Sequence, residues 1–314
     1  MESVLKIFTG NANRPLAEEI CRYVKRPLGQ AEVVDFPDGE TWVKINDNIR
    51  GHDVFLIQST NPPARNIMEL LIMIDACRRA SPRRLTVVLP YFGYARQDRK
   101  DQPRVPITAK LMANLITTAG TDRLLTMDLH SAQIQGFFDI PFDHLFASPV
   151  FVDHVKSRFH RDLVVVAPDI GSVKMARAYA TRLDAPLALI DKRRMSGEEV
   201  EVMNVIGEVD GRNVVIFDDI ISTGGTLMRA ARALKERGAK EIMACITHAV
   251  FADSVFDKLE RSDISALAVT NTIWHDPKAI TGRTKKVEIL SVARILGEAM
   301  QRIHHEESLS SLFI

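Results

Sequence analysis

Short apolar runs alternate with amphipathic helical stretches along most of this 314-residue chain. The runs that read as strands are 54–58, 85–90, 124–129, 164–168, 187–191, 214–219 and 242–250. Helical spacing of apolar residues predicts helices around 64–80 and 106–119. Parallel strands are joined by crossovers that are usually helices, so the alternation predicts an α/β fold with mainly parallel sheets flanked by helices.

The chain is longer than a single hydrophobic core usually serves, which favours two domains. Segment 140–149 carries Pro141 and Pro149 and follows the first set of strand and helix units. Paired prolines in such a segment favour a connection between domains. We therefore expect the first domain to span 1–146 and the second to begin at residue 147.

Composition limits the partners. Lysine plus arginine total 41 and aspartate plus glutamate total 40, so no net field directs the chain to nucleic acid or to an anionic membrane. We expect neither as a partner.

The three cysteines, Cys21, Cys77 and Cys245, are odd in number and scattered, which fits reduced thiols in a cytoplasmic protein. We expect no signal peptide, because the first ten residues lack its apolar core.

Two acids stand where a predicted strand meets a helix. Residues 214–217 are apolar, Asp218 and Asp219 follow them, and helical spacing begins at Leu227. In an arbitrary sequence an Asp-Asp pair more often caps a helix. Here the pair lies at the carboxyl end of an apolar strand, where open α/β sheets bind ligands, and this position favours a binding role.

Small residues join this strand to the helix. They are Ser222, Thr223, Gly224, Gly225 and Thr226. Backbone N–H groups in such a loop, at the start of a helix, are suited to a phosphate. Because carboxylates repel phosphate, the combination predicts a sugar phosphate whose hydroxyls donate hydrogen bonds to Asp218 and Asp219. The loop lacks the Gly-Lys-Ser/Thr ending of a Walker A motif.

Other charged or polar residues follow predicted strands. They are Arg96, Gln97 and Arg99 in PYFGYARQDRK, His130 in MDLH, Asp169 in APDIG, and Lys192 and Arg194 after LALID. Taken alone, the basic stretches also fit solvated surface, and a lone histidine is more often structural. A carboxylate at a strand end is a natural partner for Mg²⁺. Residues 193–199 have no apolar period, so we predict a mobile loop there.

Five stretches together resemble the ribose-phosphate diphosphokinase family, also called the phosphoribosyl pyrophosphate synthetases. They are FPDGE at 36–40, PYFGYARQDRK at 90–100, TMDLHSAQIQGFFDIP at 126–141, DKRR at 191–194, and the acid pair with its loop at 218–226. The resemblance implies two tandem type I phosphoribosyltransferase-like domains. Residues 1–146 form the ATP side, joined by the C-terminal helix and tail at about 290–314, and residues 147–289 form the ribose 5-phosphate side.

The resemblance implies a Mg²⁺-dependent enzyme of nucleotide biosynthesis. It transfers the diphosphate of ATP to the 1-hydroxyl of ribose 5-phosphate, giving 5-phosphoribosyl 1-diphosphate and AMP. The residues carried over to ATP are Phe36, Asp38, Gly39, Glu40, Arg96, Gln97 and Arg99. Those carried over to ribose 5-phosphate are Arg194, Asp218, Asp219, Ser222, Thr223, Gly224, Gly225 and Thr226. The expected metal ligands are His130 and Asp169, and the expected catalytic cations are Lys192 and Arg194.

The resemblance also implies a homohexamer built from dimers, with FPDGE completing a neighbour's ATP site. The tail HEESLSSLFI resembles that of the phosphate-activated, ADP-inhibited class. The expected allosteric residues are Gln135, Asp143, Ser308 and Ser310. Ser222 favours the opposite, because DDIISTGGT resembles members that lack this control. Met195 and segment 272–277 also depart from the family pattern, which leaves the subclass open.

Three functions are compatible with the acid-pair motif: the diphosphokinase, a phosphoribosyltransferase, and a non-catalytic regulatory relative of the diphosphokinase. A phosphoribosyltransferase has no need of an ATP segment such as 90–100. A regulatory relative is expected to have lost site residues, whereas the candidates named above are all present. The diphosphokinase therefore remains the preferred prediction.

Overall fold

The computed structural model describes residues 3–194 and 201–312. Contacts within the chain divide it into two compact units. Unit 1 contains Met1–Phe146, Thr272–Trp274 and Ser291–Ile314, and unit 2 contains Ala147–Asn271 and His275–Leu290. Each unit is thus assembled from separate parts of the sequence.

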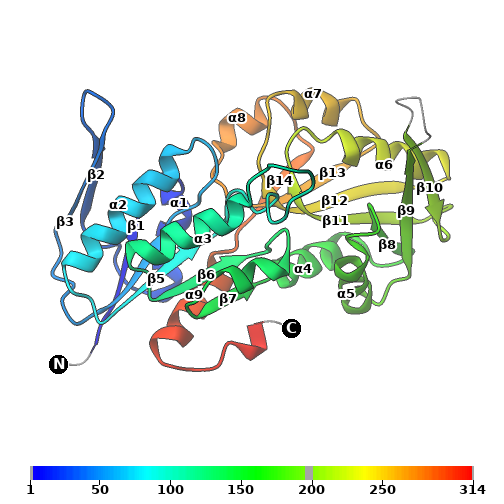
Figure 1. Cartoon of the computed structure of the whole chain (residues 1–314). Helices are drawn as coiled ribbons and strands as arrows, with labels where there is room; N and C mark the ends of the chain where they lie inside the picture. The colour runs from blue at the N-terminus through cyan, green and yellow to red at the C-terminus, as the bar shows by residue number, and fades with distance from the viewer. Residues whose placement is uncertain (1–2, 195–200, 313–314) are drawn as a thin grey trace. The chain divides into compact units, whose positions relative to one another are not determined.

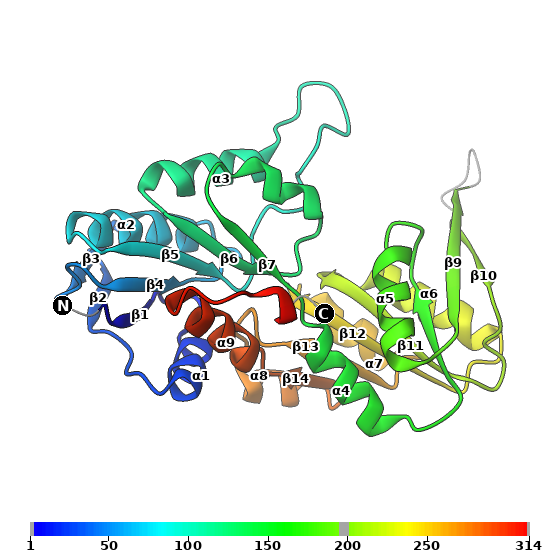
Figure 2. The ribbon, with the colours of Figure 1, turned by 90° about the horizontal axis from the view of Figure 1, so that it is seen from below.

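Unit 1 centres on a five-stranded parallel sheet in the order β1-β4-β5-β6-β7. The strands are β1 (Leu5–Thr9), β4 (Asp53–Ile57), β5 (Arg84–Leu89), β6 (Arg123–Met127) and β7 (Phe142–Leu145). The helices are α1 (Arg14–Val24), α2 (Arg65–Arg79), α3 (Thr108–Ala119) and α9 (Ala293–His304), with short 3-10 helices η1 (Ala132–Phe137) and η2 (Ser310–Leu312). In Figure 2, α2 and α3 lie on one face of this sheet and α1 and α9 on the other.

A separate antiparallel hairpin also belongs to unit 1. It pairs β2 (Ala31–Asp35) with β3 (Thr41–Ile45), and Asp35 lies opposite Thr41 at the end of the ladder. The five residues 36–40 form the turn between the two strands. The hairpin therefore presents the FPDGE segment at its tip (Figure 1).

Unit 2 centres on a seven-stranded sheet in the order β10-β9-β8-β11-β12-β13-β14. The strands are β8 (Leu163–Ala167), β9 (Leu187–Arg194), β10 (Glu201–Ile206), β11 (Asn213–Ile221), β12 (Glu241–Ala249), β13 (Ala266–Thr270) and β14 (Val287–Leu290). The helices are α4 (Ser148–Arg158), α5 (Val173–Leu183), α6 (Gly225–Glu236), α7 (Ser254–Glu260) and α8 (Pro277–Thr281). All neighbouring strands in this sheet are parallel except β9 and β10. In Figure 1, α4 and α5 lie on one face of the sheet and α6, α7 and α8 on the other.

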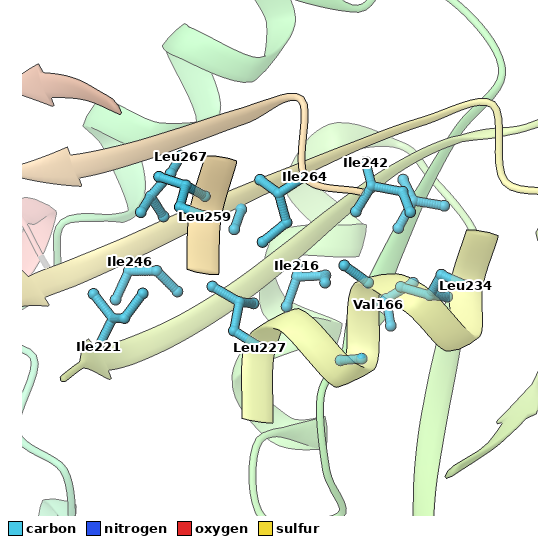
Figure 3. Close-up of a cluster of buried hydrophobic side chains, with 14 of the residues drawn as sticks. Val166, Ile216, Ile221, Leu227, Leu234, Ile242, Ile246, Leu259, Ile264 and Leu267 are labelled. Atoms are coloured by element: carbon cyan, nitrogen blue, oxygen red, sulfur yellow. The ribbon is translucent and has the colours of Figure 1, made fainter. Parts of the chain in front are cut away.

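Burial on both faces explains the continuous apolar run at the start of β11. Ile216 belongs to a core with Leu227 and Leu234 of α6 (Figure 3). The next residue, Phe217, faces the other way and stacks on Tyr179 of α5, with ring centroids 3.7 Å apart. Each such buried side chain contributes roughly 1.5–3 kcal/mol relative to exposure. The strand is therefore fixed from both sides just before the acid pair.

The predicted α/β architecture is confirmed, with two differences at the candidate sites. β11 does not end at the acid pair but continues to Ile221, because its ladder with β12 extends to Ile221 opposite Ala249. β9 does not end at residue 191 but continues to Arg194, because β10 pairs with it there. Among the described residues, no helix is both long and apolar enough to cross a membrane.

A buried ion cluster ties α9 to the sheet of unit 1. Asp53 opens β4 and is almost fully buried. Its Oδ1 accepts from Nε of Arg84 on β5 at 2.9 Å, and its Oδ2 lies 2.9 Å from Nδ1 of His304 on α9. Arg84 also donates to the carbonyl oxygen of Ile303 at 2.8 Å. One carboxylate therefore links β4 and β5 to α9.

Asp53→Asn should lower the free energy of unfolding by ~3 kcal/mol, because it leaves the guanidinium of Arg84 without its charged partner. Urea denaturation followed by circular dichroism measures this. The matched control is Asp75→Asn, which breaks the exposed Asp75–Arg79 pair on α2 and should change stability by less than about 0.5 kcal/mol. Equal stability losses in the two variants would contradict the role given to Asp53.

Candidate active site

The acid pair lies inside β11, next to a third carboxyl group. Asp218 and Asp219 are half-buried, and the backbone N–H of Asp219 donates to Asp218 Oδ1 at 3.0 Å. Asp169 follows β8, the strand beside β11. The parallel register aligns Val166 with Ile216, so the residues that follow these positions in the two strands lie at the same edge of the sheet. Three carboxyl groups therefore lie near one another, one shortly after β8 and two inside the carboxyl-terminal half of β11.

These carboxyl groups influence one another. Burial, followed by the negative charge of Asp219 and to a smaller extent that of Asp169, raises the pKa of Asp218 to about 8. A carboxyl group whose ionisation is opposed in this way is stabilised by added hydrogen-bond donors or by a cation. The cluster is thus electrostatically incomplete without a ligand that supplies one of these.

The loop after β11 has the geometry of an anion site. Gly224 has φ of 69°, a left-handed conformation that side chains resist. A Cβ there would also meet Met228 Cε and Val255 Cγ2, each at 3.0 Å. Gly225 begins α6, whose first-turn N–H groups have no partner within the helix. The predicted order of strand, small-residue loop and helix is confirmed.

Local hydrogen bonds orient the carboxylate of Asp169. The backbone N–H of Ser172 donates to Asp169 Oδ1 at 2.9 Å, and the Ser172 hydroxyl donates to the Asp169 carbonyl oxygen at 2.9 Å. Ser172 was not predicted from the sequence as a site residue. Over residues 3–194 and 201–312, no group of three or more His, Cys, Asp or Glu side chains could hold a metal ion alone.

Lys192 and Arg194 lie near the end of β9, opposite Met203 and Glu201 of β10. The predicted loop at 193–199 is therefore wrong for its first two residues, which are part of a strand. The rest of that prediction, 195–199, lies outside the described residues, as do Met195 and the side chains of Lys192 and Arg194.

The basic stretch of unit 1 follows the carboxyl end of β5. Arg96, Gln97 and Arg99 are all exposed. Gln97 joins the stretch to α3, because its carbonyl oxygen accepts from the Ala109 N–H at 3.2 Å and its Oε1 accepts from the Thr108 hydroxyl at 2.5 Å. The turn that carries the guanidinium groups of Arg96 and Arg99 is thus anchored to α3 through Gln97.

Sequence reasoning missed the residue that shapes this turn. Thr60 follows β4, and its buried hydroxyl accepts from the Gly93 N–H at 2.8 Å and donates to the Tyr91 carbonyl oxygen at 3.1 Å. A Cβ on Gly93 would collide with the Thr60 carbonyl oxygen. The polar segment 58–60 after an apolar strand was the signal that could have drawn attention to it.

His130 follows β6, the strand beside β5, and its side chain is exposed.

In the FPDGE turn, Phe36, Asp38, Gly39 and Glu40 are all exposed. The turn is closed by the Phe36 N–H, which donates to the Glu40 carbonyl oxygen at 2.8 Å. The Phe36 ring is 47% exposed and lies 6.5 Å from the ring of Trp42. An aromatic ring held this way at a hairpin tip can stack on a flat ligand.

The proposed allosteric residues are also in unit 1. Asp143 on β7 is paired with Arg123 on β6, whose Nη2 donates to Asp143 Oδ1 at 2.9 Å. Ser308 and Ser310 are exposed, and their hydroxyl oxygens lie 2.8 Å apart. Gln135 donates to the Ala132 carbonyl oxygen within η1.

Comparisons with known proteins cover both units. Residues 5–120 match a family described as the N-terminal domain of ribose phosphate pyrophosphokinase, and residues 193–314 match the phosphoribosyl synthetase-associated domain. The chain is 52% identical over 313 residues to the ribose-phosphate pyrophosphokinase of Thermotoga maritima, covering 98% of each. It is 52% identical over 311 residues to that of Rhizobium meliloti, covering 98% of this chain and all of the relative.

A solved structure extends the comparison to three dimensions. The phosphoribosylpyrophosphate synthetase of Mycobacterium smegmatis superimposes with a TM-score of 0.89 at 37% identity, covering 96% of this chain and 99% of that one. The chain belongs to the ribose-phosphate pyrophosphokinase family.

Proposed function

We propose that this chain acts in the cytoplasm and transfers the diphosphate of ATP to the 1-hydroxyl of ribose 5-phosphate, giving 5-phosphoribosyl 1-diphosphate and AMP. The observation that carries the proposal is the acid pair of β11 beside the small-residue loop that opens α6, in a chain of this family. One ligand with hydroxyls and a phosphate satisfies both features.

In this proposal the acid pair binds the ribose part of ribose 5-phosphate. The ribose hydroxyls donate hydrogen bonds to Asp218 and Asp219, which favours their ionised forms against the burial and repulsion that raise the pKa of Asp218. The 5-phosphate accepts from the N–H groups of the loop Ser222–Thr226 and the first turn of α6. The sugar therefore bridges the carboxylates and the amides and keeps its phosphate away from the acids.

ATP is bound by unit 1 in this proposal. The exposed cations Arg96 and Arg99 hold its phosphates, Gln97 adds polar contacts, and Phe36 of a neighbouring subunit stacks on the adenine. Asp38, Gly39 and Glu40 complete the adenine contacts from the same turn. Lys192 and Arg194 supply positive charge to the transferring diphosphate, a role that matters most in the transition state.

Mg²⁺ is the metal ion in this proposal. Asp169 offers the carboxylate oxygen that Mg²⁺ prefers, and His130 is a second candidate ligand. Since no cluster of three ligands occurs in the described part of the chain, substrate phosphates and water would complete the coordination. The ion, when bound, would neutralise charge on the phosphates.

Purified protein should form AMP from ATP only when ribose 5-phosphate and Mg²⁺ are both present. An assay coupled to AMP measures the rate, and excess EDTA should abolish it because the phosphate charge is no longer neutralised. The reaction without sugar is the control for plain hydrolysis of ATP. AMP formation independent of ribose 5-phosphate, or full activity in chelator, would refute the proposal.

Asp218→Asn and Asp219→Asn should each raise the KM for ribose 5-phosphate by about tenfold or more, as expected for lost hydrogen bonds to a charged group. The KM for ATP should change by less than about twofold, because the acids do not contact ATP. Asp184→Asn, at an exposed position of the same unit, should leave both constants unchanged. An equal rise in the KM for ribose 5-phosphate and the KM for ATP would argue against binding of the sugar by the acid pair.

We further propose a homohexamer built from dimers and controlled by phosphate and ADP through Gln135, Asp143, Ser308 and Ser310. The exposed serines of the tail support an anion site that a second subunit completes. ADP should inhibit beyond competition with ATP, and Ser308→Ala should reduce that excess inhibition to a purely competitive pattern. ADP titrations at limiting and saturating ATP measure this, with sedimentation velocity reporting the assembly. Purely competitive inhibition of the wild type would eliminate the allosteric site.

A further inference from the structure

Two carbonyl groups of the loop after β11 are held from the same side of unit 2. The Ser222 carbonyl oxygen accepts from the Ala252 N–H at 3.2 Å. The Thr223 carbonyl oxygen accepts from Nζ of Lys258 at 3.2 Å. Ala252 precedes α7 and Lys258 lies on it, so both donors belong to one neighbouring segment.

Because peptide groups are planar, the direction of these two carbonyls also sets the direction of the N–H groups that follow them. In a planar trans peptide, the C=O of one residue and the N–H of the next point in opposite directions. With the Ser222 and Thr223 carbonyls turned toward residues 252–258, the N–H groups of Thr223 and Gly224 must point away from them. Successive N–H groups in a turn that includes a left-handed residue form an anion-binding concavity, and Gly224 is such a residue.

We propose that Lys258 is a positioning residue for the phosphate loop. Its ammonium group holds the Thr223 carbonyl and thereby aims the Gly224 N–H at the 5-phosphate of ribose 5-phosphate. This inference rests on the proposed function and adds to it a residue 35 positions along the chain from the loop it orients.

The helix that carries Lys258 is packed into the core of unit 2. Leu259 of α7 packs in the same core as Ile221 and Leu227, which flank the loop on either side (Figure 3). The end of α7 is held by Lys286, whose Nζ donates to the carbonyl oxygens of Leu259 and Glu260. Lys258 itself is exposed. Truncating its side chain should therefore leave the helix in place and remove only the hold on the loop.

The test measures ribose 5-phosphate binding by isothermal titration calorimetry, and kcat and KM by AMP formation. Lys258→Met keeps the apolar stem and removes the donor. Its Kd and KM for ribose 5-phosphate should rise about fivefold, comparable to the loss of one hydrogen bond. The KM for ATP, kcat at saturation and the thermal unfolding midpoint should stay unchanged. Lys258→Arg, which restores a donor, should recover most of the affinity.

Lys235 provides a matched control at the other end of α6. Its Nζ also donates to backbone carbonyls, those of Ala239 and Lys240, each at 3.2 Å. Lys235→Met should leave the Kd for ribose 5-phosphate unchanged. A Lys258→Met variant that binds the sugar phosphate like the wild type or loses ATP affinity equally would overturn the positioning role. A wild type that binds no ribose 5-phosphate would overturn both the proposed function and the positioning role of Lys258. If the wild type binds ribose 5-phosphate and this binding depends on Lys258, but no AMP is formed, only the proposed diphosphate transfer is refuted.

Discussion

Parallel pairing of neighbouring strands is the constraint on which the candidate site depends. Because parallel strands all end at one edge, residues far apart in sequence emerge there together. In unit 2 the pairing of β8 with β11 brings Asp169 to the acid pair. In unit 1 the pairing of β5 with β6 places the basic stretch and His130 after adjacent strands. The long helical crossovers are what permit this alignment.

Charge arrangement is the second determinant. Carboxyl groups collect at the end of β8 and in β11, and burial together with mutual repulsion raises the pKa of Asp218. A few residues later the chain presents amides, because the Ser222 and Thr223 carbonyls are bonded to the neighbouring segment. An acceptor-rich strand is thereby followed at once by a donor-rich turn. A ligand with hydroxyls at one end and a phosphate at the other matches that order.

Periodicity predicted β4, β5, β6, β8, β9, β11 and β12 and the helices α2, α3 and α6, because burial on two faces or on one stripe leaves a direct record in the apolar pattern. It did not predict the hairpin β2–β3 or the strands β1, β7, β10, β13 and β14. The same pattern located Asp218 and Asp219 relative to their strand. It could not give the length of that strand, since β11 continues to Ile221 only through pairing with β12, more than twenty residues later. Nor could it reveal Thr60 or Lys258, whose side chains bond backbone atoms of residues 33 and 35 positions away. Contacts of this kind follow from tertiary packing, and the sequence marks only the polar segment 58–60 that contains Thr60.

The link from Asp53 to His304 has a consequence for the biosynthesis of the chain. Unit 1 takes β1 from residues 5–9 and α9 from residues 293–304, with all of α4 to α8 encoded in between. The buried carboxylate of Asp53 meets its histidine only after α9 has left the ribosome. Translation thus supplies every segment of unit 2 before it supplies the helix that the ion cluster of unit 1 requires.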